Sequence, residues 1–324
     1  MDELAGLLDG PRARGAFLLR ALLEPPWSLR VEDQAPLTLV AMMRGEAWVI
    51  PDSAAPPEPG PREPQPLHPG DVAIMRGPDP YTVADDPATP PQVIIYPGQR
   101  CATPGGEDLS QTMDLGVRTW GNSAHGPTMM IVGTYQMSGE ISQRLLAALP
   151  ALVLAPRSAG VTPLLTLLGE EIGKDQPGQD VVLDRLLDLL LIAVLRSWFS
   201  CPEAGAPGWY RAYGDPIVGR ALRMLHHHPD RPWTVAMLAA GIGVSRAALG
   251  RRFTELVGEP PMTYLTGWRL ALAADLLRDP DATIGAIARK VGYSSPFALS
   301  TAFKRVRGIS PRQHRQYHPW SPAR

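Results

Sequence analysis

TVAMLAAGIGVSRAALGRRFTELVGEPP, residues 234–261, and TIGAIARKVGYSSPFALSTAFKRVRGISP, residues 283–311, are two copies of one pattern. A unit repeated in tandem is assigned before its parts, because the copies share one local fold. The second copy has one extra residue. With that allowance, the aligned pairs include Thr234 and Thr283, Gly243 and Gly292, Ser245 and Ser294, Phe253 and Phe303, and Pro261 and Pro311.

Each copy predicts a short helix, a turn and a second helix. In the first copy Thr234 is expected to cap the first helix and Ser245 the second, with a turn at residues 241–244 between them. Apolar residues spaced i, i+4 and i+7 mark the buried face of each second helix. They are Leu249, Phe253 and Leu256 in the first copy, and Leu299, Phe303 and Val306 in the second. This order of elements is a helix-turn-helix.

The opposite face of each second helix is expected to be exposed. It carries Arg246, Ala247, Gly250, Arg251 and Thr254 in the first copy, and Phe297, Ser300, Thr301 and Lys304 in the second. Pro296 falls in the first helical turn, where proline is tolerated. Arg can bridge two acceptors of guanine, and small residues let a helix approach the major groove closely. The predicted partner is therefore double-stranded DNA.

A long helix is predicted between the copies, at residues 261–278. We call the second helix of each copy a reading head. The long helix would fix the separation of the two reading heads. Two heads on one face of DNA would lie about 34 Å apart, which is one helical turn.

The charge distribution also points to nucleic-acid binding by one half of the chain. The 324 residues are 44% hydrophobic and 19% charged, which suits about two folded domains. The formal net charge is -1, but residues 216–324 have 16 Lys and Arg against 6 Asp and Glu, whereas the rest has 15 against 26. A basic C-terminal part and an acidic N-terminal part predict a polyanion partner for the C-terminal part only.

The N-terminal half predicts a β-rich domain at residues 1–139. Short apolar runs between turn residues favour an antiparallel barrel or sandwich, and they lie at residues 37–41, 47–50, 72–75, 92–96 and 129–133. The proline-dense segment 51–66 is expected to be a mobile loop that does not pair in a sheet. The turn Pro69-Gly70-Asp71 before an apolar strand looks like the second half of a cupin barrel.

Beyond residue 139 the apolar period becomes helical, which predicts a helical segment at residues 140–200. Asp180 is expected to cap its longest helix, whose apolar surface is wider than one stripe. Such a helix either lies between two layers or pairs with its copy in a homodimer, and we expect the homodimer. Residues 201–214 are expected to be a linker, and residues 215–324 the DNA-binding domain.

Metal and redox chemistry have little support in the sequence. His68, beside a turn, is expected at the surface, and the run His226-His227-His228 is expected at a solvated helix end. Cys101 and Cys201 are too few for a disulfide framework. Cys101 is either a redox sensor, because Arg100 precedes it, or an ordinary loop residue. No cofactor and no metal is predicted.

A cytoplasmic protein that does not enter the membrane is expected. Residues 1–10 are acidic and lack the features of a secretory signal. The longest apolar run, residues 189–195, is far shorter than the ~20 residues that a membrane span requires.

Residues 216–315 strongly resemble the C-terminal DNA-binding domain of AraC-type (AraC/XylS) transcription regulators. The resemblance rests on AIARKVGYSS at residues 286–295, AFKR at 302–305 and GISP at 308–311. The N-terminal half is similar to the cupin-like sensor domain of one branch of that family. The resemblance implies that the N-terminal domain binds an effector or dimerises, and that the protein activates or represses a promoter. An activator would also have RNA polymerase as a partner.

The resemblance also implies which positions read bases. They are Ala247, Gly250 and Arg251 in the first head, and Pro296, Phe297, Ser300 and Thr301 in the second. Two positions depart from the family, because Thr301 stands where Arg is frequent and His314 where Tyr is frequent. A missing Arg removes a bidentate base contact that gives about 1–3 kcal/mol of discrimination. The second head is therefore expected to clamp the backbone, and Phe297 either touches a thymine methyl or packs under the turn.

Two other functions fit parts of the sequence. A metal-dependent cupin enzyme fused to a DNA-binding domain would need a cluster of His and Glu ligands, which is not recognisable here. A non-specific nucleoid protein would bind any duplex equally at a given salt concentration. The sequence favours a third function, an α+β transcription regulator that is not an enzyme. It would have a cupin-like barrel, a helical dimerisation segment and an all-α domain of two helix-turn-helix units, with a small-molecule or redox effector.

Overall fold

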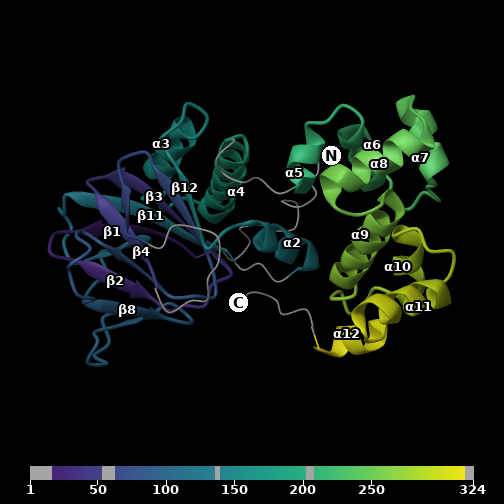
Figure 1. Ribbon diagram of the computed structural model, residues 1–324. Coiled ribbons are helices and arrows are strands. Elements are labelled where there is room, and N and C mark those ends of the chain that lie inside the picture. The colour runs from purple at the N-terminus through teal and green to yellow at the C-terminus, as the bar shows by residue number, and fades with distance from the viewer. Residues whose placement is uncertain (1–16, 53–62, 136–138, 202–207, 318–324) are drawn as a thin grey trace. The chain divides into compact units, whose positions relative to one another are not determined.

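The computed structural model describes residues 17–52, 63–135, 139–201 and 208–317 (Figure 1). Within these ranges the chain forms two compact units. One unit consists of residues 17–135 and 146–201, and the other of residues 139–145 and 208–317. The acidic segment at residues 1–10, on which the signal-peptide expectation rests, lies outside the described residues.

Two six-stranded sheets form the β-rich unit. The first has the order β10 (Thr119–Gly121), β1 (Phe17–Leu23), β11 (Thr128–Tyr135), β3 (Leu37–Arg44), β6 (Val72–Arg76) and β12 (Leu152–Ala155). The second has the order β5 (Gln65–Leu67), β4 (Ala47–Pro51), β7 (Tyr81–Ala84), β2 (Ser28–Val31), β8 (Val93–Tyr96) and β9 (Arg100–Ala102). Adjacent strands are antiparallel except β1 with β10 and β2 with β8. The predicted cupin-like barrel is confirmed.

The proline-dense segment pairs in a sheet at both of its ends, so the prediction of a loop over residues 51–66 was wrong there. Pro51 ends β4, and Pro66 lies opposite Trp48 in β5. β5 is the outer strand of its sheet, where a missing N–H costs no ladder hydrogen bond. The middle of the segment, residues 53–62, lies outside the described residues.

The turn before β6 has the predicted form. Gly70 has a φ of +95°, in the region that favours glycine. The Asp71 carboxylate accepts hydrogen bonds from the amides of His68 and Arg157, each at 2.9 Å. The His68 side chain is 58% exposed, which confirms its surface position.

Three helices follow β11 in the sequence: α2 (Glu140–Ala148), α3 (Thr162–Glu171) and α4 (Gln179–Phe199). α4 packs against the first sheet, where the Tyr135 hydroxyl donates to the Leu187 carbonyl oxygen at 2.8 Å. A Cβ at Gly133 would lie 2.7 Å from the Leu187 side chain, so glycine permits this approach. The other face leaves apolar side chains exposed, namely Val181, Val182 and Leu189.

The predicted cap of α4 was wrong. Gly178, with a φ of +81°, is the N-cap residue, and no side chain caps the helix. Asp180 lies in the first turn instead, where its carboxylate accepts a hydrogen bond from the Arg118 guanidinium.

The C-terminal unit is helical. Its helices are α5 (Gly208–Tyr213), α6 (Val218–His227), α7 (Val235–Ile242), α8 (Arg246–Val257), α9 (Pro261–Leu276), α10 (Ile284–Lys290), α11 (Pro296–Arg307) and α12 (Pro311–Tyr317). α5 corrects the expectation of a linker over residues 201–214, because it contacts α6 and α8 and buries Ala212 completely. Residues 202–207 of that linker lie outside the described residues.

α9 completes the cores of both helix-turn-helix units. Its N-terminal half contributes Tyr264 and Leu265 to the core of α6, α7 and α8. Its C-terminal half contributes Leu270, Ala273 and Ala274 to the core of α10 and α11. A single helix of 16 residues, about 24 Å long, therefore joins the two heads.

Four side chains cap the helices of the repeat. Thr234 and Ser245 accept hydrogen bonds from the amides three residues later, and Thr283 and Ser295 do the same in the second copy. The cap of α11 is Ser295, so the extra residue of the second copy precedes the cap, and Ser245 corresponds to Ser295. Val306 is 56% exposed, so its predicted inward position was wrong.

Arg269 on α9 connects the segment between α6 and α7 to the second copy. Its Nε donates to the Pro229 carbonyl oxygen at 2.7 Å, and its Nη2 donates to the Arg231 carbonyl oxygen at 2.5 Å. The same guanidinium lies 5.9 Å from the centre of the Tyr293 ring. Gly292 leaves room for this junction, because a Cβ there would lie 2.6 Å from both Arg269 Nη2 and the Pro229 oxygen.

His226 is not solvated, contrary to the prediction. Its ring stacks on Trp268 with centroids 4.2 Å apart, and its Nε2 lies 2.9 Å from the Tyr264 hydroxyl. His226 therefore joins α6 to α9, whereas His227 and His228 are exposed.

Replacing Gly292 with Ala should destabilise the C-terminal unit far more than replacing Gly243. Both glycines have a left-handed φ, +84° and +86°, so each substitution costs about 1–2 kcal/mol for the backbone alone. Gly243 has no atom within 4 Å of the added Cβ, whereas Gly292 has three within 3 Å. Overpacking should add about 1–3 kcal/mol at Gly292. Urea unfolding, with hydrogen exchange of α10 to localise the effect, measures the difference, and equal losses would contradict the role given to the junction.

Candidate functional site

The two reading heads, α8 and α11, present matched positions on one scaffold. Each begins directly after a capping serine, so their residues correspond one to one from the first turn. The corresponding pairs are Arg246 and Pro296, Ala247 and Phe297, Gly250 and Ser300, and Arg251 and Thr301. The residues predicted to contact DNA are therefore brought to equivalent places.

The first head offers two cations at its surface. Arg246 and Arg251 are exposed, and neither has a hydrogen bond or ion pair within the described residues. The small residues Ala247 and Gly250 separate them. Arg252 is different, because its guanidinium donates to the Asp215 carboxylate at 2.5 and 2.8 Å. That hydrogen bond lowers the pKa of Asp215, so the pair stays ionised at neutral pH.

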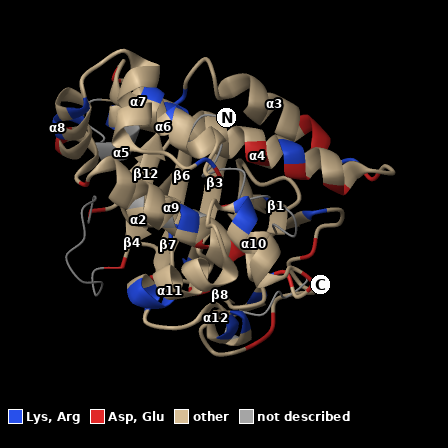
Figure 2. Cartoon of the chain, turned by 90° about the vertical axis from the view of Figure 1, so that its right-hand side faces the viewer, with Lys and Arg blue, Asp and Glu red and all other residues tan. Residues whose placement is uncertain are grey.

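The second head offers hydroxyls and an aromatic ring at the same places. Phe297 is 80% exposed, so the alternative that it packs under the turn was wrong. The Ser300 hydroxyl donates to the Pro296 carbonyl oxygen at 2.8 Å, and its oxygen can accept a hydrogen bond from a ligand at the same time. Thr301 and Lys304 are exposed, and the cations of α11 lie in its C-terminal half (Figure 2).

These side chains can act on DNA in different ways. A guanidinium on the first head reaches two acceptors of one guanine, whereas a hydroxyl makes a single contact that discriminates less. Lys304 offers a point charge of the kind that contacts phosphate. An exposed ring such as Phe297 can contact a thymine methyl group.

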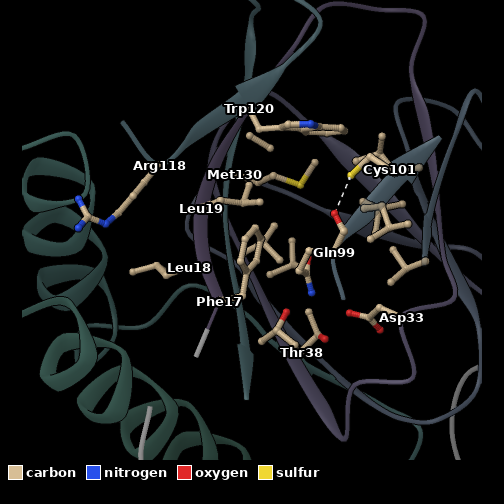
Figure 3. Close-up of a pocket in the computed structure, with 18 of the residues that line it drawn as sticks. Phe17, Leu18, Leu19, Asp33, Thr38, Gln99, Cys101, Arg118, Trp120 and Met130 are labelled. Atoms are coloured by element: carbon tan, nitrogen blue, oxygen red, sulfur yellow. Dashed lines mark hydrogen bonds between the residues drawn. The ribbon is translucent and has the colours of Figure 1, made fainter. Parts of the chain in front are cut away.

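A cavity of about 330 Å³ lies between the two sheets of the β-rich unit (Figure 3). Its walls are mainly apolar side chains from both sheets. Asp33, Thr38 and Gln99 gather at one end, and Trp120 lies at the other. Within the described residues no group of three His, Cys, Asp or Glu side chains is arranged to hold a metal.

The chain is similar to known proteins over both units. The cupin family matches residues 2–200, and a helix-turn-helix domain matches residues 238–317. An AraC-like transcription regulator from Streptomyces lividans is 32% identical over 99% of this chain and 100% of that protein. The chain belongs to the AraC family. It is thus a DNA-binding transcription regulator with a cupin-like N-terminal domain.

A second regulator and one solved structure are also similar to this chain. The regulator AlkR of Acinetobacter baylyi is 28% identical over 98% of this chain and 99% of its own length. The DNA-binding domain of AdpA, solved with a target DNA, is 33% identical, covers 32% of this chain and 93% of that chain, and has a TM-score of 0.30. In the described ranges of this AraC-family chain, no helix is long and apolar enough to cross a membrane.

The structure also positions residues that the sequence did not single out. Arg269 lies in a helix that periodicity predicts, but periodicity does not reveal its partners, the carbonyl oxygens of Pro229 and Arg231. Asp33 and Thr38 lie near each other in the sequence, but Gln99 is distant from both and meets them only in the folded barrel. No spacing in the sequence marks them as neighbours.

Cys101 lies in a setting that keeps its thiol protonated. The side chain borders the cavity, and its Sγ donates to the Gln99 carbonyl oxygen at 3.6 Å (Figure 3). Burial raises the pKa of the Cys101 thiol, and the Asp108 carboxylate raises it further. Because the thiolate is the reactive form, this setting weighs against redox sensing.

The alkylation rate of Cys101 should rise only above the pH at which ordinary thiols react. In a Cys201→Ser variant, iodoacetamide labelling of Cys101 followed by mass spectrometry should give a midpoint above that of the exposed Cys201 in a Cys101→Ser variant. Since the raised pKa leaves little thiolate at pH 7, labelling there should be slow. Rapid labelling with a midpoint below pH 7 would restore the redox interpretation.

Proposed function

We propose that this regulator reads two adjacent major-groove segments with unequal heads, and that α8 supplies most of the sequence discrimination. The observation that carries the proposal is the pairing of Arg251 with Thr301 at corresponding positions of the two heads. The shared helix α9 and the Arg269 junction support a fixed spacing between the heads.

In this proposal Arg251 makes a bidentate contact with guanine, and Arg246 contacts a base or a phosphate beside it. Ala247 and Gly250 let the backbone of α8 approach the groove, because neither has a long side chain. α11 binds the second segment through Pro296, Phe297, Ser300 and Thr301, and Lys304 contacts phosphate. Phe297 contributes an apolar contact, which favours thymine.

The N-terminal unit acts, in this proposal, through binding and dimerisation and not through catalysis. The exposed apolar residues of α4 support a homodimer, since Val181, Val182 and Leu189 would be covered by a second copy. The regulator acts on DNA in the cytoplasm, and an effector alters its contact with the promoter or with RNA polymerase. The relatives' names as transcription regulators support a chain that is not an enzyme.

Arg251→Ala should lower affinity for the preferred duplex about 10- to 100-fold, because one bidentate pair gives about 1–3 kcal/mol of discrimination. Affinity for random duplex should change little. The preferred duplex is selected from a random pool by the wild-type protein, and fluorescence anisotropy gives both affinities at one salt concentration.

Lys304→Ala is the matched control for that experiment. A lost phosphate contact should weaken specific and random binding alike and reduce the slope of log affinity against log salt by about one. If Arg251→Ala behaved in the same way as Lys304→Ala, Arg251 would be a phosphate contact and α8 would not dominate.

Thr301→Arg should increase the selectivity of the second head. The position is exposed on α11 and corresponds to Arg251, so a guanidinium there has room to reach a base. Selection with the variant should enrich guanine at one position of the second segment, with about tenfold discrimination against other bases. An unchanged selected sequence would show that α11 does not lie in a major groove.

A further inference from the structure

The cavity of the β-rich unit has two chemically different ends. Its volume of about 330 Å³ is at the lower end of the range for ligand sites. Its long walls come from β1, β2, β3, β7, β8 and β11, and their side chains include Leu19, Leu29, Val40, Val83, Ile95 and Val132. A ligand with an apolar body would fit these walls without leaving polar groups unpaired.

Trp120 closes the apolar end. Figure 3 shows its ring at that end of the cavity, with Met130 and Cys101 between it and the polar end. A flat ring and a methionine provide a surface that adapts to a planar or flexible apolar group. The Cys101 thiol is occupied by the Gln99 carbonyl oxygen, and the Trp120 indole N–H, which is buried without a hydrogen-bond partner among the described residues, is a single donor at this end.

The polar end is built around Asp33. Its Oδ1 accepts from the Ala35 amide at 3.0 Å, and its side chain is also hydrogen-bonded to Gln99. Burial raises the pKa of Asp33, as expected for a carboxylate drawn out of water without a cation beside it. A carboxylate has more acceptor sites than these two bonds use, so it can accept another hydrogen bond.

Among the residues that the structure describes, no cation is available in the cavity to balance an acidic ligand. Arg118 is the cationic residue that borders the cavity in the described chain. Its side chain points away from the cavity toward the helices (Figure 3), where it donates to the Asp180 carboxylate and to the Lys174 carbonyl oxygen. An anion placed at the polar end would meet the Asp33 carboxylate without compensation.

We propose that this cavity binds a small molecule that has an apolar body and one hydrogen-bond donor, a hydroxyl or an amine, which is directed to Asp33. A cavity of about 150 Å³ holds benzene, so a volume near 330 Å³ suits a ligand of about 12 non-hydrogen atoms. The proposal deepens the proposed function by naming the effector class. It rests on that function only for the effect of the ligand on regulation, because binding of the ligand itself is measured without DNA.

Three probes that share one apolar body test the donor requirement. They are 2-naphthalenemethanol, 2-naphthalenemethylamine and 2-naphthoate, titrated into the full-length protein by calorimetry at pH 7. The alcohol and the amine should bind with dissociation constants on the order of 10–100 μM, and the naphthoate at least about tenfold more weakly. Tighter binding of the naphthoate, or no binding of the alcohol and the amine, would overturn the proposal.

Asp33→Asn tests the contact itself. The substitution should weaken binding of the amine about tenfold and binding of the alcohol by less. It should strengthen binding of the naphthoate, because the repelling charge is removed. Asp86→Asn is the matched control: Asp86 also accepts from the amide two residues later, at 2.8 Å, but it does not border the cavity. Equal effects of the two variants would overturn the role of Asp33.

Filling the cavity tests the location. Val132→Trp and Leu19→Trp, on neighbouring strands, should each abolish binding of the alcohol while circular dichroism stays that of the wild type. Wild-type affinity in either folded variant would place the ligand elsewhere and overturn the proposal. If neither variant folds, the Asp33→Asn titration still decides. DNA binding is measured in parallel, so loss of the regulator function and loss of the ligand site are told apart.

Discussion

The C-terminal unit depends on one helix that belongs to two cores. α9 supplies residues to the core of each helix-turn-helix unit, so neither unit is complete without it. Arg269 reinforces this arrangement because its guanidinium binds the carbonyl oxygens of Pro229 and Arg231, between α6 and α7, beside Gly292 of the second copy. Burying a guanidinium is costly unless its donors are paired, and these carbonyls pair them. The spacing of α8 and α11 is therefore a property of the fold and not of the bound DNA.

On that fixed frame the two heads differ in chemistry alone. Capping serines start both helices, and their corresponding positions face outward alike. The first head places long cations around small residues, whereas the second places a ring and hydroxyls at the same points. A repeat with one scaffold can thus combine a selective contact with a tolerant one, because the scaffold sets position and the exposed residues set discrimination.

Local signals in the sequence predicted the helices of the repeat well, since apolar period and capping residues act over one or two turns. They failed where the partners are distant in the chain. His226 was placed in solvent because nothing nearby reveals Tyr264 and Trp268 on α9. β12 was missed because its apolar run directly follows a leucine-rich helix, and its pairing with β6 is long-range. The cavity could not be predicted for the same reason, as its polar end joins side chains from separate strands and loops.

β11 forms the boundary between the cavity and α4. Met130, Val132 and Thr134 border the cavity, while the alternate positions Gly133 and Tyr135 meet Leu187 of α4. A ligand that shifted β11 from the cavity side would also shift the surface that meets Leu187. In that case thermodynamic reciprocity requires the ligand and a partner bound to α4 to change each other's affinity by the same factor.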